Sequence, residues 1–127
     1  MTAEEKEKLS AIAAEEQRQD QELLKQGKVL ALKSFSYQRE YDRIVAKGEV
    51  KNITDQPMTS VVPNVSFYAA DRKRIRSAKG TMAILPLKPG QSATFDASAD
   101  YHPLMRYSNV TFSTAEGKPL PAGEYPK

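Results

Sequence analysis

The residues best suited to bind something form a basic run over positions 71–79, which holds five bases and one acid and so carries a charge of +4. If this run forms a strand, side-chain alternation places Arg72, Arg74 and Arg76 on one face, about 7 Å apart. Such a row of guanidinium groups suits phosphate or carboxylate groups on a polymer or a membrane surface. The alternative is a solvent-facing edge strand whose charges, including Lys79, discourage aggregation.

The residues that could support catalysis are few and scattered. His102 is the single histidine, which is too few for a zinc site, and no Gly-x-Ser-x-Gly motif supplies a nucleophile for a catalytic triad. Asp96 and Asp100, with Glu116 farther along, have no spacing that holds them on a shared face, so we expect solvated turn acids. The chain has no cysteine and no phosphate, dinucleotide or calcium loop. We therefore expect no enzyme, no cofactor and no metal.

A helix is predicted at the start of the chain. Residues 3–26 contain no proline or glycine and consist mostly of strong helix formers, and Gly27 stands where a glycine ends a helix. Its apolar side chains lie near the two ends, and residues 15–22 are wholly polar. We expect a solvated helix that leans on the domain through its two leucine ends, because a helix without an apolar stripe packs poorly. A stalk towards a membrane anchor and a short oligomerising helix are the alternatives.

The remainder reads as β structure. Alternating apolar and polar side chains predict six or seven short strands, over residues 29–37, 43–52, 59–69, 72–83, 91–97 and 105–113. The first two are expected to form a hairpin, with Ala31 and Phe35 on one face and Lys33 interrupting it. Pro63 inside the third segment indicates an edge strand or a bulge. Short strands separated by turn residues at this spacing are typical of an antiparallel sandwich.

Three motifs in this region resemble, in order and spacing, the FxLYD-domain family. They are Gly48-Glu49-Val50-Lys51-Asn52, the aromatic segment from Val61 to Ala70, and the segment from Leu87 to Phe95 that contains a Pro-Gly-Gln turn. In that family a GxVxN strand precedes an aromatic strand ending in a Tyr-Asp turn and then an LxPGQxxxF segment. The resemblance covers residues 29–113, with Ala69 standing where the family's Asp follows the tyrosine.

The resemblance implies a small immunoglobulin-like domain of bacterial and archaeal envelope proteins, often behind a lipoprotein or membrane anchor. It brings no enzymatic activity and no common ligand, so the residues carried over are structural: Gly48, Asn52, Phe67, Tyr68, Pro89, Gly90 and Phe95. In this picture Gly48 allows a close approach or a bulge, and Asn52 bonds backbone at a strand end. Pro89 and Gly90 set a turn, while the two phenylalanines fill the core.

The predicted fold is an all-β immunoglobulin-like antiparallel β-sandwich of about seven strands preceded by an N-terminal α-helix. Its parts are a polar helix or stalk over residues 1–28, the sandwich over 29–115 and a Pro/Gly-rich tail, extended or mobile, over 116–127. No segment has the ~20 apolar residues that a transmembrane helix needs.

The predicted function is a non-enzymatic, envelope-associated structural or protein-binding module that docks to another protein or to a second copy. The alternative is a polyanion-binding module that uses the basic strand 72–79 on anionic lipid, cell-wall polymer or nucleic acid. No aromatic side chain is interleaved with that run, so sequence-specific nucleic-acid binding is not expected. We expect a periplasmic or cell-surface location with an anchor upstream, or a cytoplasmic one if Met1 is the native start.

Overall fold

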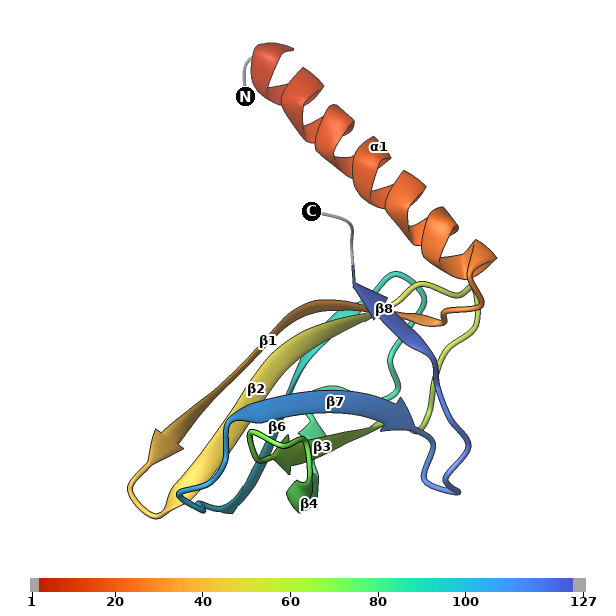
Figure 1. Cartoon of the computed structure of the whole chain (residues 1–127). Coiled ribbons are helices and arrows are strands. Elements are labelled where there is room, and N and C mark those ends of the chain that lie inside the picture. The colour runs from red at the N-terminus through yellow and green to blue at the C-terminus, as the bar shows by residue number, and fades with distance from the viewer. Residues whose placement is uncertain (1–2, 125–127) are drawn as a thin grey trace.

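Two β-sheets stacked face to face, with one helix at an end, make up the computed structural model, which describes residues 3–124 and side chains from residue 14 onward (Figure 1). The elements are α1 (Ala3–Lys25), β1 (Leu30–Glu40), β2 (Arg43–Asn52), β3 (Val62–Tyr68), β4 (Arg74–Lys79), β5 (Thr81–Met82), β6 (Ser92–Asp100), β7 (Tyr107–Ser113) and β8 (Ala122–Glu124). A five-stranded sheet has the order β5-β6-β2-β1-β8, and a three-stranded sheet has the order β4-β3-β7. The predicted β-sandwich behind an N-terminal helix is confirmed.

Helix α1 ends where the sequence predicts. Gly27 has a φ of 84°, in the left-handed region that glycine favours. The Gly27 N–H donates to the Leu24 carbonyl and the Lys28 N–H donates to the Leu23 carbonyl, each at 3.0 Å, which is the Schellman pattern. Across residues 3–124, no helix combines the length and the apolarity needed to cross a bilayer. Figure 1 shows α1 projecting from one end of the sandwich, while the hairpin between β1 and β2 forms the opposite end.

A β-bulge at Lys33 decides which side chains of β1 reach the core. The pairing of β1 with β2 shifts between Leu32 and Ser34, so Lys33 is an extra residue. One extra residue reverses the alternation, and Leu30 and Phe35 therefore both pack between the sheets. Ala31 was predicted on the face of Phe35, which is wrong: it lies on the outer face, against the helix.

The position of Pro63 also differs from the prediction, because β3 is the central strand of its sheet and no edge strand. The Pro63 carbonyl accepts a hydrogen bond of 2.7 Å from the Gly80 N–H, so its nitrogen faces the same side. Pairing with β4 reaches only as far as Lys79, opposite Asn64. The missing proline N–H therefore falls just beyond the end of the neighbouring strand and costs no ladder bond.

The predicted strand over residues 72–83 is in fact two strands in different sheets. β4 pairs with β3, and β5 pairs with β6 across the sandwich. The chain changes sheet at Gly80, where a Cβ atom would overlap the Asp96 carbonyl oxygen. A glycine is needed at this crossing because the two backbones nearly touch.

The last three described residues, 122–124, belong to the predicted tail but form β8, which pairs in parallel with β1. The structure therefore has one parallel strand pair where an all-antiparallel sandwich was predicted. Residues between β7 and β8 are held by backbone bonds, including that from the Leu120 N–H to the Phe112 carbonyl at 2.9 Å.

The core lies between the two sheets in two clusters that share Phe35 and Val110 at their boundary. Phe95 stands edge-on to Phe112 with ring centroids 5.3 Å apart, and Phe67 is fully buried in the second cluster. Phe67 and Phe95 therefore fill the core as predicted.

Candidate binding site

Helix α1 is fastened to the domain at its C-terminal end. Leu23 is 4% exposed and packs against Ala31 and Ile53. Gly123 of β8 lies so close that a Cβ atom there would stand 2.7 Å from Leu23 Cδ2. One of the two predicted leucine ends therefore contacts the sandwich, and the side chains of the other end lie outside the described residues.

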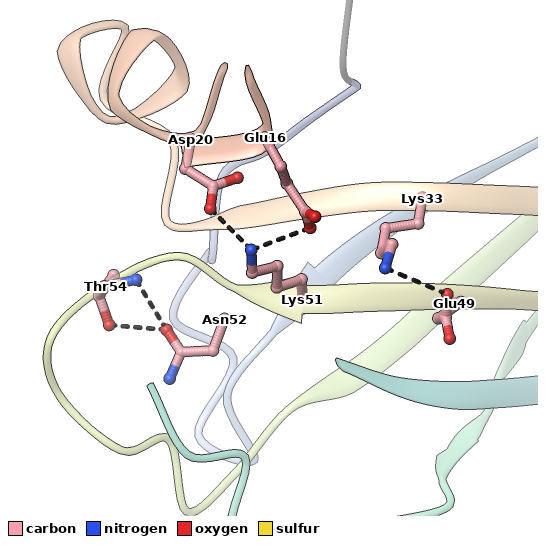
Figure 2. Close-up of polar contacts among 7 residues, drawn as sticks. All are labelled: Glu16, Asp20, Lys33, Glu49, Lys51, Asn52 and Thr54. Atoms are coloured by element: carbon pink, nitrogen blue, oxygen red, sulfur yellow. Dashed lines mark hydrogen bonds and ion pairs between the residues drawn. The ribbon is translucent and has the colours of Figure 1, made fainter. Parts of the chain in front are cut away.

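The polar middle of α1 also contacts the domain, contrary to the expectation of a solvated stretch. Lys51 Nζ lies 2.8 Å from Asp20 Oδ2 and 3.0 Å from Glu16 Oε1 (Figure 2). The two acids are four residues apart, so they share one helix face. Burial by itself lowers the pKa of Lys51, but the hydrogen bonds that its ammonium donates to the Asp20 and Glu16 carboxylates outweigh burial and raise this pKa above its ordinary value.

A shallow groove of about 540 Å³ runs along the outer face of the five-stranded sheet, lined by Ser34, Lys47, Glu49, Thr94 and Asp96, among others. Its charges have both signs, and the Lys33 and Glu49 side chains form an ion pair of 3.7 Å beside it (Figure 2). The lining holds one base and two acids, Lys33 beside it offsets the second acid, and charges that cancel in this way give no preference for a ligand of either sign. Below its floor, a Cβ atom at Gly48 would overlap the Phe95 ring, so Gly48 permits a close approach.

Asn52 is a structural residue at the end of β2, fully buried. Its amide N–H groups donate to the Gln56 carbonyl at 2.8 Å and the Leu87 carbonyl at 2.9 Å. Its Oδ1 accepts from the N–H and the hydroxyl of Thr54, at 2.9 and 2.7 Å (Figure 2). The Gly90 N–H donates to the Asn52 carbonyl at 2.8 Å. One side chain thus fixes the loops that follow β2 and precede β6.

The turn from Lys88 to Gln91 has the expected chemistry. Pro89 occupies its second position and Gly90, with a φ of 76°, its third, and the Gln91 N–H donates to the Lys88 carbonyl at 3.0 Å. This is the arrangement of a type II turn, which requires a positive φ at the third position.

The candidate catalytic groups do not converge. His102 Nδ1 accepts a hydrogen bond of 3.1 Å from the Leu104 N–H, so it shapes its own loop. Asp100 is paired with Arg43 at 2.8 Å. Asp96 and Asp100 were predicted in turns, which is wrong, because both lie on β6. They share its outer face but stand about 13 Å apart at 3.3 Å per residue. Within residues 3–124, no group of three or more potential ligands is placed to hold a metal ion.

The predicted row of arginines is also wrong. Arg72 precedes β4, in a turn closed by the Arg72 N–H on the Ala69 carbonyl at 2.9 Å, and its φ is 68°. A register shift then sets Arg74 opposite Tyr68 and Arg76 opposite Phe67. Since those two β3 residues are consecutive, they point to opposite faces, and so the two arginines do not form one row. Both side chains and that of Lys79 are exposed along the edge strand β4.

The end of the sandwich opposite α1 gathers tyrosine and arginine side chains from β1, β2, β3, β7 and the adjoining loops. We call it the tyrosine–arginine end, made of Tyr37, Arg39, Tyr41, Arg43, Tyr68, Arg72, Tyr101, Leu104, Arg106 and Tyr107. Tyr41 is 94% exposed and stands at the tip of the hairpin between β1 and β2 with a φ of 58°, which is rare outside glycine and asparagine. Leu104 and Tyr107 are also more than half exposed.

These side chains are held in place by one another. The Arg39 Nε–H donates to the Tyr41 carbonyl at 2.7 Å, and the Arg39 guanidinium lies 4.2 Å from the centroid of the Tyr101 ring. The Tyr37 hydroxyl donates to the Arg106 carbonyl at 3.3 Å. Such contacts reduce the conformational entropy that these side chains would lose on binding.

A pocket of about 310 Å³ opens at this end, lined by Tyr68, Arg72, Tyr107, Ser108 and Asn109. Tyr68 and Tyr107 are cross-strand partners on β3 and β7. Its lining contains one cation and no carboxylate. The Ser108 side chain lies on the face of its cross-strand partner Phe67, and its buried hydroxyl has no hydrogen-bond partner among the described residues.

The basic run predicted a role for Arg72, and the family resemblance gave Tyr68 a structural role, but the other residues of this end were missed. The available signal was position: Tyr41, Tyr68, Tyr101 and Tyr107 lie at or next to strand ends that antiparallel connections bring together, and Tyr37 lies three residues before the end of β1. Comparison of the chain with protein-family models, curated proteins and solved structures found no match.

Proposed function

We propose that this chain is a non-enzymatic protein-binding module: an immunoglobulin-like sandwich, held on a helical spacer, that binds its partner through the tyrosine–arginine end. The observation that carries the proposal is the gathering of exposed tyrosines and arginines at the end of the sandwich opposite α1. Tyrosine and arginine are enriched among the residues that dominate protein–protein binding energy. The gathered side chains lack the converging acids and bases of a catalytic site.

The strand order supports the immunoglobulin-like assignment. In that fold one sheet has the strand order ABED and the other contains CFG, with C′ beside C in the variable type. Naming the strands in chain order makes β1-β2-β6-β5 correspond to ABED and β4-β3-β7 to C′CF. The last strand differs, because β8 joins the other sheet next to β1. With the motif resemblance, this order favours an FxLYD-like domain.

The envelope location is part of the proposal and rests on the FxLYD resemblance. The geometry is compatible with it, since α1 leaves the sandwich at the end away from the tyrosine–arginine end (Figure 1). A helix of 23 residues is about 35 Å long at 1.5 Å per residue and would hold that end away from an anchored surface.

The experiment is affinity capture from extracts of the source cells, with the partner identified and its affinity measured. The Tyr41→Ala/Tyr107→Ala variant should bind that partner at least tenfold more weakly, because exposed aromatic anchors are removed. Ile84→Ala is the matched control, since Ile84 is 44% exposed but lies in the loop after β5, away from this end. Equal binding by all three proteins would refute the proposal.

Polyanion binding by the edge strand β4 is the second candidate. Arg74, Arg76 and Lys79 are exposed there, and none of them forms an ion pair with another described residue. Retention on heparin or on anionic vesicles should then fall steeply with salt and fall further in Arg74→Glu. Lys88→Glu, an equal charge change at an exposed turn residue, is the control. Identical retention of the two variants would exclude a role for the strand.

A further inference from the structure

The four sheet edges of this fold are protected unequally. β5 has two residues and β8 three, so both are too short to template another strand. β4 is longer but carries Arg74, Arg76 and Lys79, and charge on an edge strand opposes further pairing. β7, from Tyr107 to Ser113, has seven residues and no charged side chain. It is the edge on which the usual protection against strand addition is absent.

The backbone of β7 presents bonding groups on its outer side. The Phe112 carbonyl accepts from the Leu120 N–H at 2.9 Å, which shows that Phe112 points away from β3. Backbone groups of alternate residues point to the same side of a strand, so Val110 and Ser108 also point outward. Within residues 3–124 no strand lies beside this stretch, because β8 pairs with β1. In an immunoglobulin-like sandwich the final strand would cover it.

Two pockets flank this free edge. The first is the pocket lined by Tyr68, Arg72 and Tyr107 at the start of β7. The second, of about 240 Å³, is lined by Lys28, Val110, Phe112, Leu120 and Ala122, among others. The first pocket lies at the start of β7 and the second nearer its end, so side chains at the two ends of an added strand would meet them. Strand addition gains affinity from backbone bonds and specificity from such pockets.

The charged side chains beside β7 favour an acidic strand as the partner of this edge. Arg72 lines the first pocket and Lys28 the second, and neither lining contains a carboxylate. An acidic strand meets a cation at each end of the edge. A second copy of this chain, paired antiparallel about a two-fold axis, would bring the Arg72 pocket of one copy towards the Lys28 pocket of the other. Like charges facing each other oppose that pairing.

We propose that an extended acidic peptide segment of the partner protein adds to β7 as a fourth strand, bonded to the backbone of Ser108 and Val110. The proposal rests on the protein-binding function above and names where and how the partner binds. Tyr107 belongs to both surfaces, so the strand would lie directly beside the tyrosine–arginine end.

The direct test adds a synthetic peptide to the ¹⁵N-labelled full chain and follows amide exchange by NMR. The probe is a ten-residue peptide in which Glu alternates with Val and Thr, and its counterpart has Lys in place of Glu. The Glu peptide should slow exchange of the Ser108 and Val110 amides at least tenfold, and the Lys peptide should not. The Asn109 and Thr111 amides, which face β3, are the internal reference. Unchanged exchange at Ser108 and Val110 would overturn the proposal.

Two variants separate backbone pairing from charge. Ser108→Pro removes an N–H that points away from β3, and it should lower the affinity for the Glu peptide at least tenfold. Because proline also restrains the strand, Asn109→Glu is the second variant: it places a like charge at an exposed position and should weaken the peptide, whereas Asn109→Lys should not. Glu-peptide affinity that is equal in Asn109→Glu and Asn109→Lys contradicts an acidic strand at this edge.

The remaining outcomes distinguish this proposal from the function on which it rests. A dimer in sedimentation experiments without peptide, lost in Ser108→Pro, would identify a second copy as the occupant and overturn the acidic peptide. Partner capture that is lost in Tyr41→Ala/Tyr107→Ala but unchanged in Asn109→Glu and Ser108→Pro would refute strand addition and leave the protein-binding function standing. Partner capture that is unaffected by all of these variants would refute both strand addition and the protein-binding function.

Discussion

Lys51 Nζ on β2 lies 2.8 Å from Asp20 Oδ2 on α1, and with Glu16 at 3.0 Å it forms a partly buried link between spacer and sandwich. The Lys51 and Asp20 side chains are only 14% and 15% exposed, so solvent screens this pair much less than a surface ion pair. The link fixes the direction in which α1 leaves the domain, and with it the position of the tyrosine–arginine end relative to anything attached to the helix.

Replacing Lys51 by Met should release the middle of α1, because the variant loses the ion pairs of Nζ with Asp20 and Glu16. We expect a loss of about 2 kcal/mol in the docking free energy of the helix, in the range of charged hydrogen bonds. Spin labels at Gln17 and Thr94 should report a broader distance distribution. Lys33→Met is the control, because the 3.7 Å pair with Glu49 is more exposed and its loss should cost less than about 0.5 kcal/mol. An unchanged distribution in Lys51→Met would contradict the role of the link.

Alkaline pH should undock α1 in the wild type. The pKa of Lys51 is raised in the folded state above its ordinary value of about 10.5. A raised lysine pKa stabilises the folded form fully below the ordinary pKa, and this contribution is lost as the pH rises through the folded pKa. The spin-label distance should therefore stay constant from pH 7 to about pH 10 and broaden above it. Tyrosines also ionise there, so Lys51→Met, which retains every tyrosine, should show no further change over the same range.

Two adjacent leucines in α1 offer a matched comparison. Leu23 is 4% exposed and Leu24 is 41% exposed, although both occupy the last turns of the same helix. Leu23→Ala should lower the docking free energy of α1 by about 2 kcal/mol, at the low end for a buried leucine because its cluster is small. Leu24→Ala should change it by less than about 0.5 kcal/mol. Amide exchange of residues 15–25 measures both, and equal effects would show that Leu23 does not hold the helix.

Much of the architecture was predictable from local patterns. The helix end at Gly27, the hairpin of β1 and β2 and the turn at Pro89 and Gly90 each depend on a few neighbouring residues. Two of the predictions that were wrong failed where a strand contains an extra residue. Ala31 was placed on the wrong face because one extra residue at Lys33 reverses alternation, and the arginine row failed for the same reason at the register shift in β4.

The candidate binding surfaces were harder to predict because they are assembled from distant segments. Tyr68 and Tyr107 stand opposite each other only because β3 pairs with β7, a pairing that the sequence between them does not specify. The free edge of β7 likewise depends on where β8 goes, and residues 122–124 contain no alternation from which a strand in the other sheet could be inferred. The contacts of Lys51 with α1 required the position of the helix on the sheet.

Asn52 should be among the most sensitive polar positions of the fold. Its buried amide makes four hydrogen bonds, to the Gln56 and Leu87 carbonyls and to Thr54. Asn52→Ala would remove the acceptor of the Thr54 N–H and one of the two donors to the Leu87 carbonyl, which keeps the Met58 N–H at 2.9 Å. A buried polar group left unsatisfied costs about 1–3 kcal/mol. We expect a loss of about 3 kcal/mol in the free energy of unfolding, measured by urea denaturation with an unchanged slope.

Asn109→Ala is the control for Asn52→Ala, because Asn109 is an exposed asparagine on β7 and should lose less than about 0.5 kcal/mol. Asn52→Asp separates shape from donor chemistry: a carboxylate retains the acceptor for Thr54 but cannot donate to the two carbonyls, so it should destabilise at least as much as alanine. If Asn52→Asp were as stable as the wild type, the carbonyl bonds would not be what holds these loops together, and the motif resemblance at this position would have to be explained by the Thr54 contact alone.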